Sequence, residues 1–213
     1  MEKRTRKFFG YNSCHFFLLM LIFAFAGFLV ENAFKLLTRG FMDSSHHFFP
    51  ATFTYSIVIF VLYGCLGTPD NMRFFNKELF RGGSRAEKAA AYILYAVLLA
   101  IGVFVGELTV GLANYYATGA VIWDYNNIPL NWKIGCPYAF TSLPTTLAFT
   151  AAGWLFMKFL FAPLMRLLEK IPVKIAVAIG AILGALLVGD YVYTLIYTQI
   201  NGFAPVYWTY TLP

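Results

Sequence analysis

The chain has 213 residues, of which 60% are hydrophobic and only 12% are charged. A soluble domain carries roughly 45–50% apolar and about 25% charged residues, so the composition excludes an ordinary soluble domain. The net charge of +6 does not indicate nucleic-acid binding, because the basic residues lie beside long apolar runs, as in loops that face anionic lipid. Cys14, Cys65 and Cys136 lack the paired spacing of metal ligands, so we expect no metal site and no disulfide.

Five apolar runs follow one another along the chain. They cover residues 16–37, 51–67, 89–116, 138–161 and 175–200, and a spanning helix needs about 20 such residues. The first run follows a basic start and contains Ala24-Phe25-Ala26, which resembles a signal-peptide cleavage site. The run continues past that point, so we expect an uncleaved first helix. The pattern predicts an all-α, polytopic membrane helix bundle that forms a single transmembrane domain over residues 1–213.

Lys and Arg are distributed unevenly between the two sides of the predicted membrane. The N-terminus has four, the 68–88 loop five and the 158–174 region four, whereas the other side has Lys35, Arg39 and Lys133. Basic loops remain in the cytoplasm. We therefore predict a multi-pass protein of the bacterial inner membrane (the cell membrane), with a cytoplasmic N-terminus and a C-terminus outside.

Glycines and loop order suggest how the helices are arranged. Gly102/Gly106 and Gly180/Gly184 have the small-xxx-small spacing that allows close helix packing, either within the chain or in a homo-oligomer. In both halves, an acid near a helix end is followed by a Gly-containing polar loop, a Pro and a returning helix. This order favours two parallel helical-hairpin repeats plus one helix, although any two helical hairpins look alike at this level.

Three carboxylates interrupt the apolar runs: Glu31, Glu107 and Asp190. At about 1.5 Å per residue, each lies roughly 24–29 Å from the cytoplasmic surface. An acid in the apolar core costs roughly 2.5–3.5 kcal/mol. We predict an outward-facing polar pocket in which at least one carboxylate is protonated or binds a cation, with Glu107 the first candidate.

The alternative is that each acid has a local structural partner. Lys35 lies at i+4 from Glu31 and could pair with it along one helix. Arg39 could reach down from the helix end, and Tyr191 or Tyr193 could donate to Asp190.

An aromatic, polar loop follows the third run and carries Trp123, Asp124 and Tyr125, then Asn131 and Lys133. Trp and Tyr suit the membrane interface. Asp124 could accept hydrogen bonds from Asn126 or backbone N–H groups in a turn, or pair with Lys133. We treat these five residues and Arg39 as candidate substrate- or ion-binding residues. The alternative is a re-entry loop held at the surface. His46-His47 does not predict a metal site by itself, because neighbouring side chains point in different directions.

At this loop the chain resembles the CmpB-type ABC-transporter permease family, also called ABC transporter type IV. The resemblance rests on Glu31, Arg39-Gly40-Phe41, Glu107, Trp123-Asp124-Tyr125, and then Asn131, Lys133-Ile134 and Pro137. It covers roughly residues 20–150. The family pattern differs at Lys133, where it has Arg, and in the return after Arg-Gly-Phe. The resemblance implies a small multi-helix bacterial membrane protein with a role in transport.

Three functions remain open from the sequence. The first is a permease with no P-loop motif of its own, so that a separate ATPase subunit would dock on the 68–88 loop. The second is a membrane-embedded enzyme that modifies lipid, which ranks lower because no recognised catalytic spacing occurs. The third is a non-catalytic membrane assembly partner packed through its glycine faces. We expect no catalytic residue and no cofactor, with membrane lipid as the surrounding partner.

Overall fold

The computed structural model describes residues 7–8, 10–75, 77–80, 84–119, 121 and 123–211, without the side chains of Lys7, Thr38, Arg39 and Phe53. It confirms an all-α architecture, with only short strands beside the helices. Four helices of the described chain are long and apolar enough to cross a membrane: Ser13–Leu37, Arg85–Thr118, Leu143–Leu168 and Val173–Asn201. The remaining predicted span, 51–67, corresponds to the shorter apolar helix α2, Phe53–Leu66. The parallel repeat stays a prediction.

The chain divides into two compact units. Unit 1 comprises residues 1–61 and 163–213, and unit 2 comprises residues 62–162. Each is described here by itself, and the single transmembrane domain stays a prediction.

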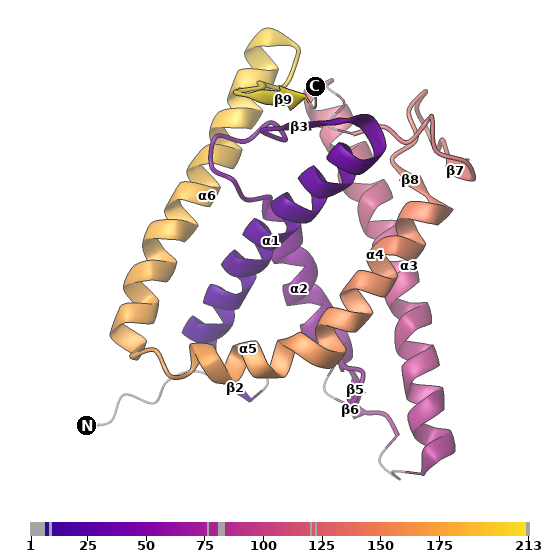
Figure 1. Cartoon of the computed structure of the whole chain (residues 1–213), viewed down its shortest axis with the longest axis vertical. Coiled ribbons are helices and arrows are strands. Elements are labelled where there is room, and N and C mark those ends of the chain that lie inside the picture. The colour runs from indigo at the N-terminus through magenta and orange to yellow at the C-terminus, as the bar shows by residue number, and fades with distance from the viewer. Residues whose placement is uncertain are drawn as a thin grey trace. The chain divides into compact units, whose positions relative to one another are not determined.

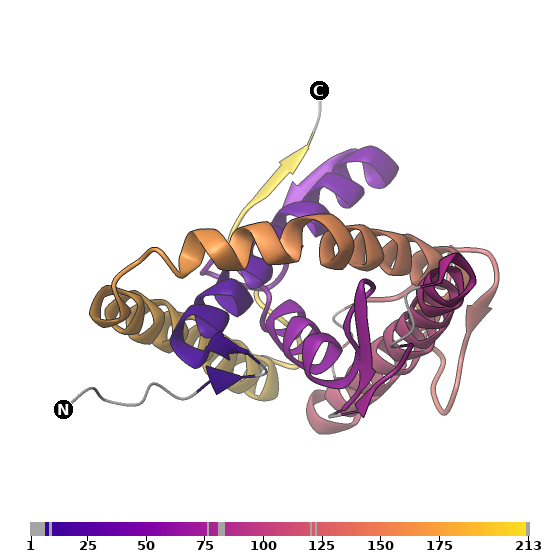
Figure 2. The same ribbon diagram turned by 90° about the horizontal axis from the view of Figure 1, so that it is seen from below.

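Unit 1 is built on α1 (Ser13–Arg39) and α6 (Val173–Asn201), which run side by side in the same direction (Figure 1). Asn12 caps the start of α1 by accepting a hydrogen bond from the Cys14 N–H (3.0 Å), and this satisfies one of the free donors of the first turn. α1 ends at Gly40, whose φ of 73° places it in the left-handed region, where glycine is unstrained. The hairpin of β1 (Lys7–Phe8) and β2 (Tyr11–Asn12) lies at the start of α1 (Figure 2).

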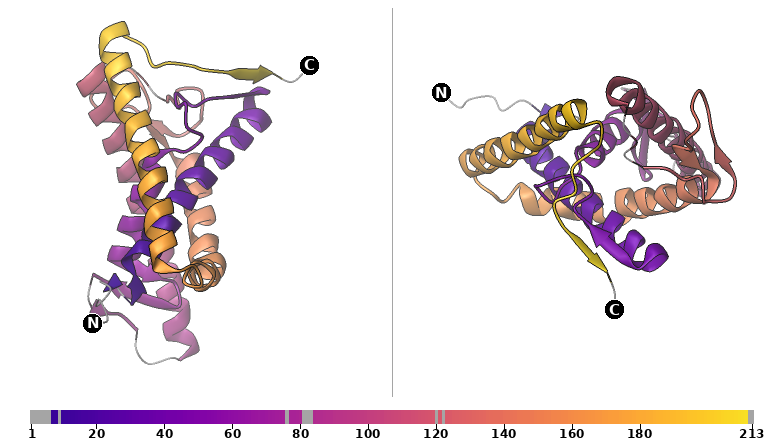
Figure 3. Two further views of the ribbon diagram at one scale, coloured as in Figure 1. Left: turned by 90° about the vertical axis from the view of Figure 1, so that its left-hand side faces the viewer. Right: turned by 90° about the horizontal axis from the view of Figure 1, so that it is seen from above.

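The two ends of unit 1 are joined by a strand pair that the sequence did not predict. β3 (Phe41–Asp43) pairs antiparallel with β9 (Thr209–Thr211), with Met42 opposite Tyr210. Figure 3 shows the chain leaving α6 and extending as β9 toward the end of α1. Part of the aromatic tail after α6 is therefore a strand that pairs with the segment following α1.

The predicted glycine contact of α6 is confirmed. A Cβ atom at Gly180 or Gly184 would lie 3.1 or 3.0 Å from ring atoms of Phe17 on α1. The corresponding prediction for α3 is wrong within the described chain, because a Cβ at Gly102 or Gly106 would meet no described atom within 4 Å.

Unit 2 is a helical hairpin with short strands at its ends. α3 (Arg85–Thr118) runs antiparallel to α4 (Leu143–Leu155), which continues into a five-residue π-helix (Phe156–Leu160) (Figure 1). The next helix, α5 (Phe161–Leu168), crosses the boundary between the units after residue 162. Ser84 and Glu87 form a capping box at the start of α3, so two backbone donors are satisfied reciprocally. α3 comes closest to the segment before α4 at Gly111, where a Cβ would fall 2.4 Å from Phe140 Cγ.

The strands of unit 2 form short antiparallel pairs within the loops that precede α3 and α4. β4 (Gly67–Thr68), β5 (Asn71–Phe74) and β6 (Lys77–Glu78) form an antiparallel meander before α3. β7 (Asn131–Trp132) pairs with β8 (Thr141–Ser142) just before α4. The fourth predicted span, 138–161, is displaced toward the C-terminus, because Ser142 caps the helix by accepting from the Thr145 N–H at 3.3 Å.

We predict that Gly27→Ala strongly destabilises unit 1. A Cβ atom at Gly27 would lie 2.2–2.8 Å from ring atoms of Tyr55, and overpacking of this kind costs about 1–3 kcal/mol. Thermal unfolding in detergent would measure the loss. Gly189→Ala on α6 is the matched control, because its Cβ meets no described atom within 4 Å. Equal melting temperatures for the two variants would contradict the contact.

Candidate functional site

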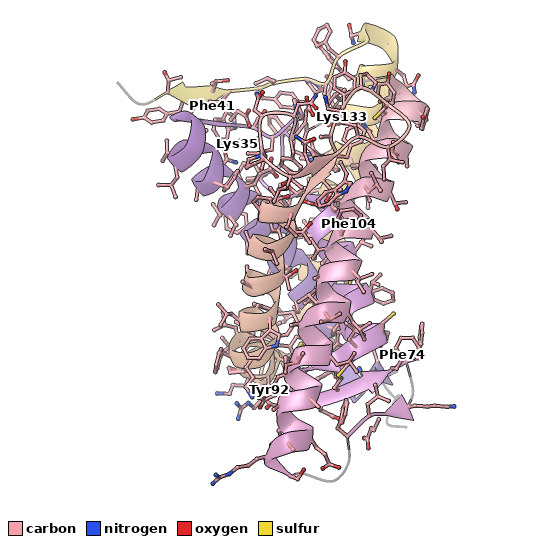
Figure 4. All side chains as sticks on the ribbon, turned by 90° about the vertical axis from the view of Figure 1, so that its right-hand side faces the viewer. Lys35, Phe41, Phe74, Tyr92, Phe104 and Lys133 are labelled. Atoms are coloured by element: carbon pink, nitrogen blue, oxygen red, sulfur yellow. The ribbon has the colours of Figure 1, made fainter. Side chains whose placement is uncertain are left out.

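The end of α1 in unit 1 carries a compact polar cluster, which we call the Lys35 network: Glu31, Asn32, Lys35, Asp43 and Ser45. Lys35 Nζ lies 2.9 Å from Glu31 Oε1 and 2.7 Å from Asp43 Oδ1, and it donates to Ser45 Oγ at 3.0 Å. Asn32 Oδ1 accepts from the Asp43 N–H at 2.9 Å. Lys35 lies just below Phe41 and the loop (Figure 4). The local pairing of Glu31 with Lys35 is therefore present.

The loop after β3 is fastened to α6 by the second carboxylate. His47 Nδ1 donates to Asp190 Oδ2 at 3.1 Å, and the Phe48 N–H donates to Asp190 Oδ1 at 2.9 Å. One turn further along α6, the Thr194 hydroxyl donates to the His46 carbonyl oxygen at 2.9 Å. The side chains of His47 and Asp190 are only 10% and 6% exposed. The sequence suggested Tyr191 or Tyr193 as donors to Asp190, whereas the structure shows donors from the loop after β3, His47 and the Phe48 N–H.

Burial and nearby charge act in opposite directions on the loop groups. Burial lowers the pKa of His47 below its ordinary value, although the charges of Asp190 and Glu31 oppose the shift. Burial disfavours charge on Asp43 as well, but hydrogen bonds from Lys35 and the Ser45 N–H outweigh it and hold the pKa of Asp43 below its ordinary value. At neutral pH the loop therefore pairs a neutral imidazole with Asp190 and a charged carboxylate with Lys35.

We predict that unit 1 loses stability as the pH falls from about 7 to 5. The pKa of His47 is lower when folded than when unfolded. Below about pH 6.5 the unfolded chain therefore binds a proton that the folded chain does not, which stabilises the unfolded state and lowers the free energy of unfolding. His47→Asn should flatten this dependence, because the amide does not titrate. Melting temperatures of both proteins between pH 5 and 8 would test it. A slope that is the same in wild type and variant would exclude His47 as its source.

In unit 2, Asp124 organises the loop between α3 and α4, which we call the Trp123 loop (residues 119–142). Asp124 Oδ1 accepts from the N–H groups of Asn126 (3.0 Å) and Ala139 (2.9 Å), and its Oδ2 accepts from Asn126 Nδ2 (2.8 Å). This is the turn interaction that the sequence offered as one alternative. Lys133, offered as the other partner, is exposed.

Two other candidate binding residues of this loop, Trp123 and Asn131, also form hydrogen bonds within it. Trp123 Nε1 donates to the Phe140 carbonyl oxygen at 2.9 Å. Asn131 Nδ2 donates to the carbonyl oxygens of Asn126 (3.2 Å) and Ile128 (2.8 Å). In Figure 4, the label Phe104 marks the part of α3 near Glu107, and the label Lys133 marks the Trp123 loop. These contacts tie the described part of the loop, residues 123–142, to itself near the end of α3.

Glu107 on α3 receives its contacts from this loop and from β8. Tyr125 Oη donates to Glu107 Oε1 and Thr141 Oγ1 donates to Glu107 Oε2, both at 3.2 Å. Thr141 is fully buried and its hydroxyl also lies 3.3 Å from Thr146 Oγ1. Among the described residues, no basic side chain forms an ion pair with Glu107. It thus differs from Glu31, which pairs with a lysine, and from Asp190, which binds a histidine.

The three carboxylates fall in different units. Glu31 and Asp190 belong to unit 1, where both act on His47. Glu107 belongs to unit 2 with Trp123, Asp124, Tyr125, Asn131 and Lys133. A pocket shared by all three therefore stays a prediction. Arg39 is the last residue of α1, and its side chain lies outside the described part of the chain.

A family model described as "Putative ABC-transporter type IV" matches residues 18–195. The chain belongs to this family. No curated protein and no solved structure matches the chain significantly.

The family match confirms the resemblance read from the sequence and extends it. The sequence resemblance covered roughly residues 20–150, whereas the family match reaches residue 195 and so includes Asp190 and most of α6. All three intramembrane carboxylates lie inside the match, together with the Lys35 network and the Trp123 loop. β9 lies beyond it, so the family region includes β3 but not its partner strand.

Two contributors to these contacts were missed by sequence reasoning. His47 binds Asp190 across 143 residues of chain, and Thr141 binds Glu107 across 34. Neither spacing is periodic, so only the folded chain reveals the pairs. A signal existed for Thr141, since Thr141, Ser142, Thr145 and Thr146 place four hydroxyls at the start of an otherwise apolar helix.

Proposed function

We propose that this chain is a permease-like membrane transport protein whose outward-facing polar site is built on intramembrane carboxylates, with Glu107 as the binding acid. The family description and the four apolar helices support a transport protein of the membrane. The observation that carries the choice of Glu107 is its set of contacts. A carboxylate in an apolar helix is expensive, and among the described residues two neutral hydroxyls are its only hydrogen-bond donors.

The remaining candidates have roles that support this site. Tyr125 touches Glu107 directly, while Trp123, Asp124 and Asn131 hold the loop that carries Tyr125. Lys133 is exposed and free to meet an anionic group of a substrate or lipid. Glu31 and Asp190 would line the site if the two units bring them near Glu107.

The energy source in this proposal is a separate ATPase that docks on the 68–88 loop. A cavity of about 440 Å³ opens between this loop and the first turns of α3, and its lining includes Asp70, Met72, Glu78, Phe80 and Tyr92. A hollow with acidic and aromatic walls suits a basic or amphipathic segment of a partner. Asp70 is tied to Lys158 and Tyr92, so movement of a docked partner would be passed to both arms of the hairpin.

Affinity capture of the full chain from bacterial membranes tests this assignment. We expect a P-loop protein to co-purify and its ATP hydrolysis to rise when both are reconstituted in lipid. Glu78→Lys should abolish capture, whereas Glu169→Lys, an exposed acid in the turn after α5, should not. Absence of any ATPase, or equal capture by both variants, would refute the proposed partner and its docking site.

We also predict the orientation of the chain from its basic loops. A cysteine at Lys77, in a background without the native cysteines, should react with a membrane-impermeant thiol reagent only after the cells are opened. A cysteine at Val206 should react in intact cells. The opposite pattern would place the 68–88 loop outside and reverse the proposed topology.

A further inference from the structure

The hydroxyl contacts of Glu107 continue beyond Thr141 into the hairpin of α3 and α4. Thr141 Oγ1 lies within hydrogen-bonding distance of both Glu107 Oε2 (3.2 Å) and Thr146 Oγ1 (3.3 Å). Thr150 follows Thr146 by four residues, so it lies on the same face of α4, one turn further from the loop. Thr141, Thr146 and Thr150 are 0%, 4% and 8% exposed. A line of buried hydroxyls therefore leads from the carboxylate along the helix.

Of these three threonines, Thr150 is the one whose hydroxyl has no evident structural role. Its hydroxyl is buried and has no hydrogen-bond partner among the described residues. A threonine inside a helix ordinarily bonds the carbonyl four residues before it, as Thr198 does with Thr194. A buried hydroxyl without a partner is costly, and an alanine or valine would fill the position without that cost. The free hydroxyl lies about 6 Å along the axis from Thr146, and one bridging water closes such a gap.

The charges around Glu107 favour exchange of a proton over exchange of a metal ion. The titratable and charged side chains near it are Tyr115 and Tyr116 on the second half of α3, and Asp124, Tyr125, Lys133, Cys136 and Tyr138 in the loop, while Arg85, Glu87, Lys88, Tyr92 and Tyr95 lie in the first turns of α3, about three or more turns away. Of these described side chains, Tyr125 alone is hydrogen-bonded to Glu107, and the α4 helix contributes no ionisable side chain. One carboxylate with hydroxyl neighbours is a poor site for a divalent cation, which prefers several charged ligands. Hydroxyls, by contrast, both donate and accept, so they satisfy the ionised and the protonated acid equally.

We propose that Glu107 is a reversible proton-binding site, and that the hydroxyls of Thr141, Thr146 and Thr150 form the relay that delivers and removes its proton. In the ionised state Thr141 donates to Glu107. When the carboxylate takes a proton, its new O–H donates to Thr141, whose own O–H turns toward Thr146, and the Thr146 O–H turns toward the water shared with Thr150. The one proton gained comes from solvent hydronium at the Thr150 end of the line and returns there on release, and each O–H···O bond reverses. This inference rests on the proposed role of Glu107 as the binding acid.

Infrared difference spectroscopy of the full chain in phosphatidylcholine membranes tests it directly. Between pH 9 and pH 5 we expect a protonated-carboxyl C=O band that is absent in Glu107→Gln and present in Glu31→Gln. The band should be the same in NaCl, KCl and choline chloride. If Glu107→Gln does not fold, Glu107→Asp replaces it and should shift the band. Absence of a Glu107-dependent band at every pH, or a band controlled by Na⁺, would overturn the proton site.

The relay is tested by the rate at which the band appears after a pH jump. Thr146→Val and Thr150→Val should slow it by about a hundredfold, the low end of what one positioned proton-transfer group contributes. Thr145→Val is the matched control, because the Thr145 hydroxyl bonds Ser142 instead and the rate should not change. Thr150→Val should also leave the melting temperature unchanged or raised, since it removes an unpartnered polar group. Unchanged rates in both relay variants would refute the relay.

These results are independent of the ATPase test. A Glu107 proton band without any ATPase partner would leave the proton site standing and remove the ATP-driven permease. An ATPase partner without the band would do the reverse.

Discussion

Replacing Lys35 with methionine should destabilise the protein by about 3 kcal/mol, because the change removes the cation that two carboxylates share. Lys35 Nζ contacts both Glu31 and Asp43, and the three side chains are 17%, 29% and 16% exposed. Breaking a buried ion pair from one side costs about 3–5 kcal/mol, and the partial exposure of Glu31 places the expected loss at the lower end. Chemical or thermal unfolding in detergent would measure it.

The control for this variant removes the charges that Lys35 would leave behind. The triple variant Lys35→Met, Glu31→Gln, Asp43→Asn has no unpaired charge, so most of the lost stability should return. Glu31→Gln alone should cost less than Lys35→Met, since Lys35 keeps Asp43. If the triple variant is as unstable as Lys35→Met, packing of the lysine stem, and not the ion pairs, holds this end of α1.

The largest functional effect is expected from Glu107→Gln. The amide keeps the shape of the side chain, and its oxygen still accepts a hydrogen bond from Tyr125 or Thr141, so the fold should be retained. It cannot take a proton or compensate a cation, so transport should be lost. Charge movement across proteoliposomes after a jump in H⁺, Na⁺ or K⁺ concentration measures this. We expect a current in wild type, none in Glu107→Gln, and a current in Glu31→Gln despite its lower stability. A wild-type current in Glu107→Gln would exclude the acid from transport.

The helices could be predicted because lipid imposes a simple rule on sequence. Long apolar runs must form helices there, and α1, α3 and α6 lie within four residues of the predicted spans 16–37, 89–116 and 175–200. α2 begins at Phe53, two residues after the start of the predicted span 51–67. The π-helix at Phe156–Leu160 has no signature in the residues that form it, so the fourth span was predicted as one regular helix.

The site was only partly predictable, because local and distant contacts leave different traces. The Glu31–Lys35 pair follows from helical spacing, and the Asp124 turn follows from the chemistry of Asp-Tyr-Asn. The β3–β9 pair joins residues 41–43 to residues 209–211, and no short-range pattern reports such a pairing. His46-His47 looked uninformative as a metal motif, yet both residues have structural contacts: His47 binds Asp190 and the His46 carbonyl oxygen accepts from Thr194.

Accessibility of position 107 from outside the cell is the most direct test of the central claim, that Glu107 lines an outward-facing polar site. Cysteine would replace Glu107, and separately Val105, which lies about 200° away around α3, in a background without native cysteines. A membrane-impermeant thiol reagent reacts with the thiolate, which forms only where water reaches it. We predict labelling at position 107 and none at position 105 in intact cells. Labelling at 105 but not at 107 would show that Glu107 does not face a water-filled site, and would contradict the account.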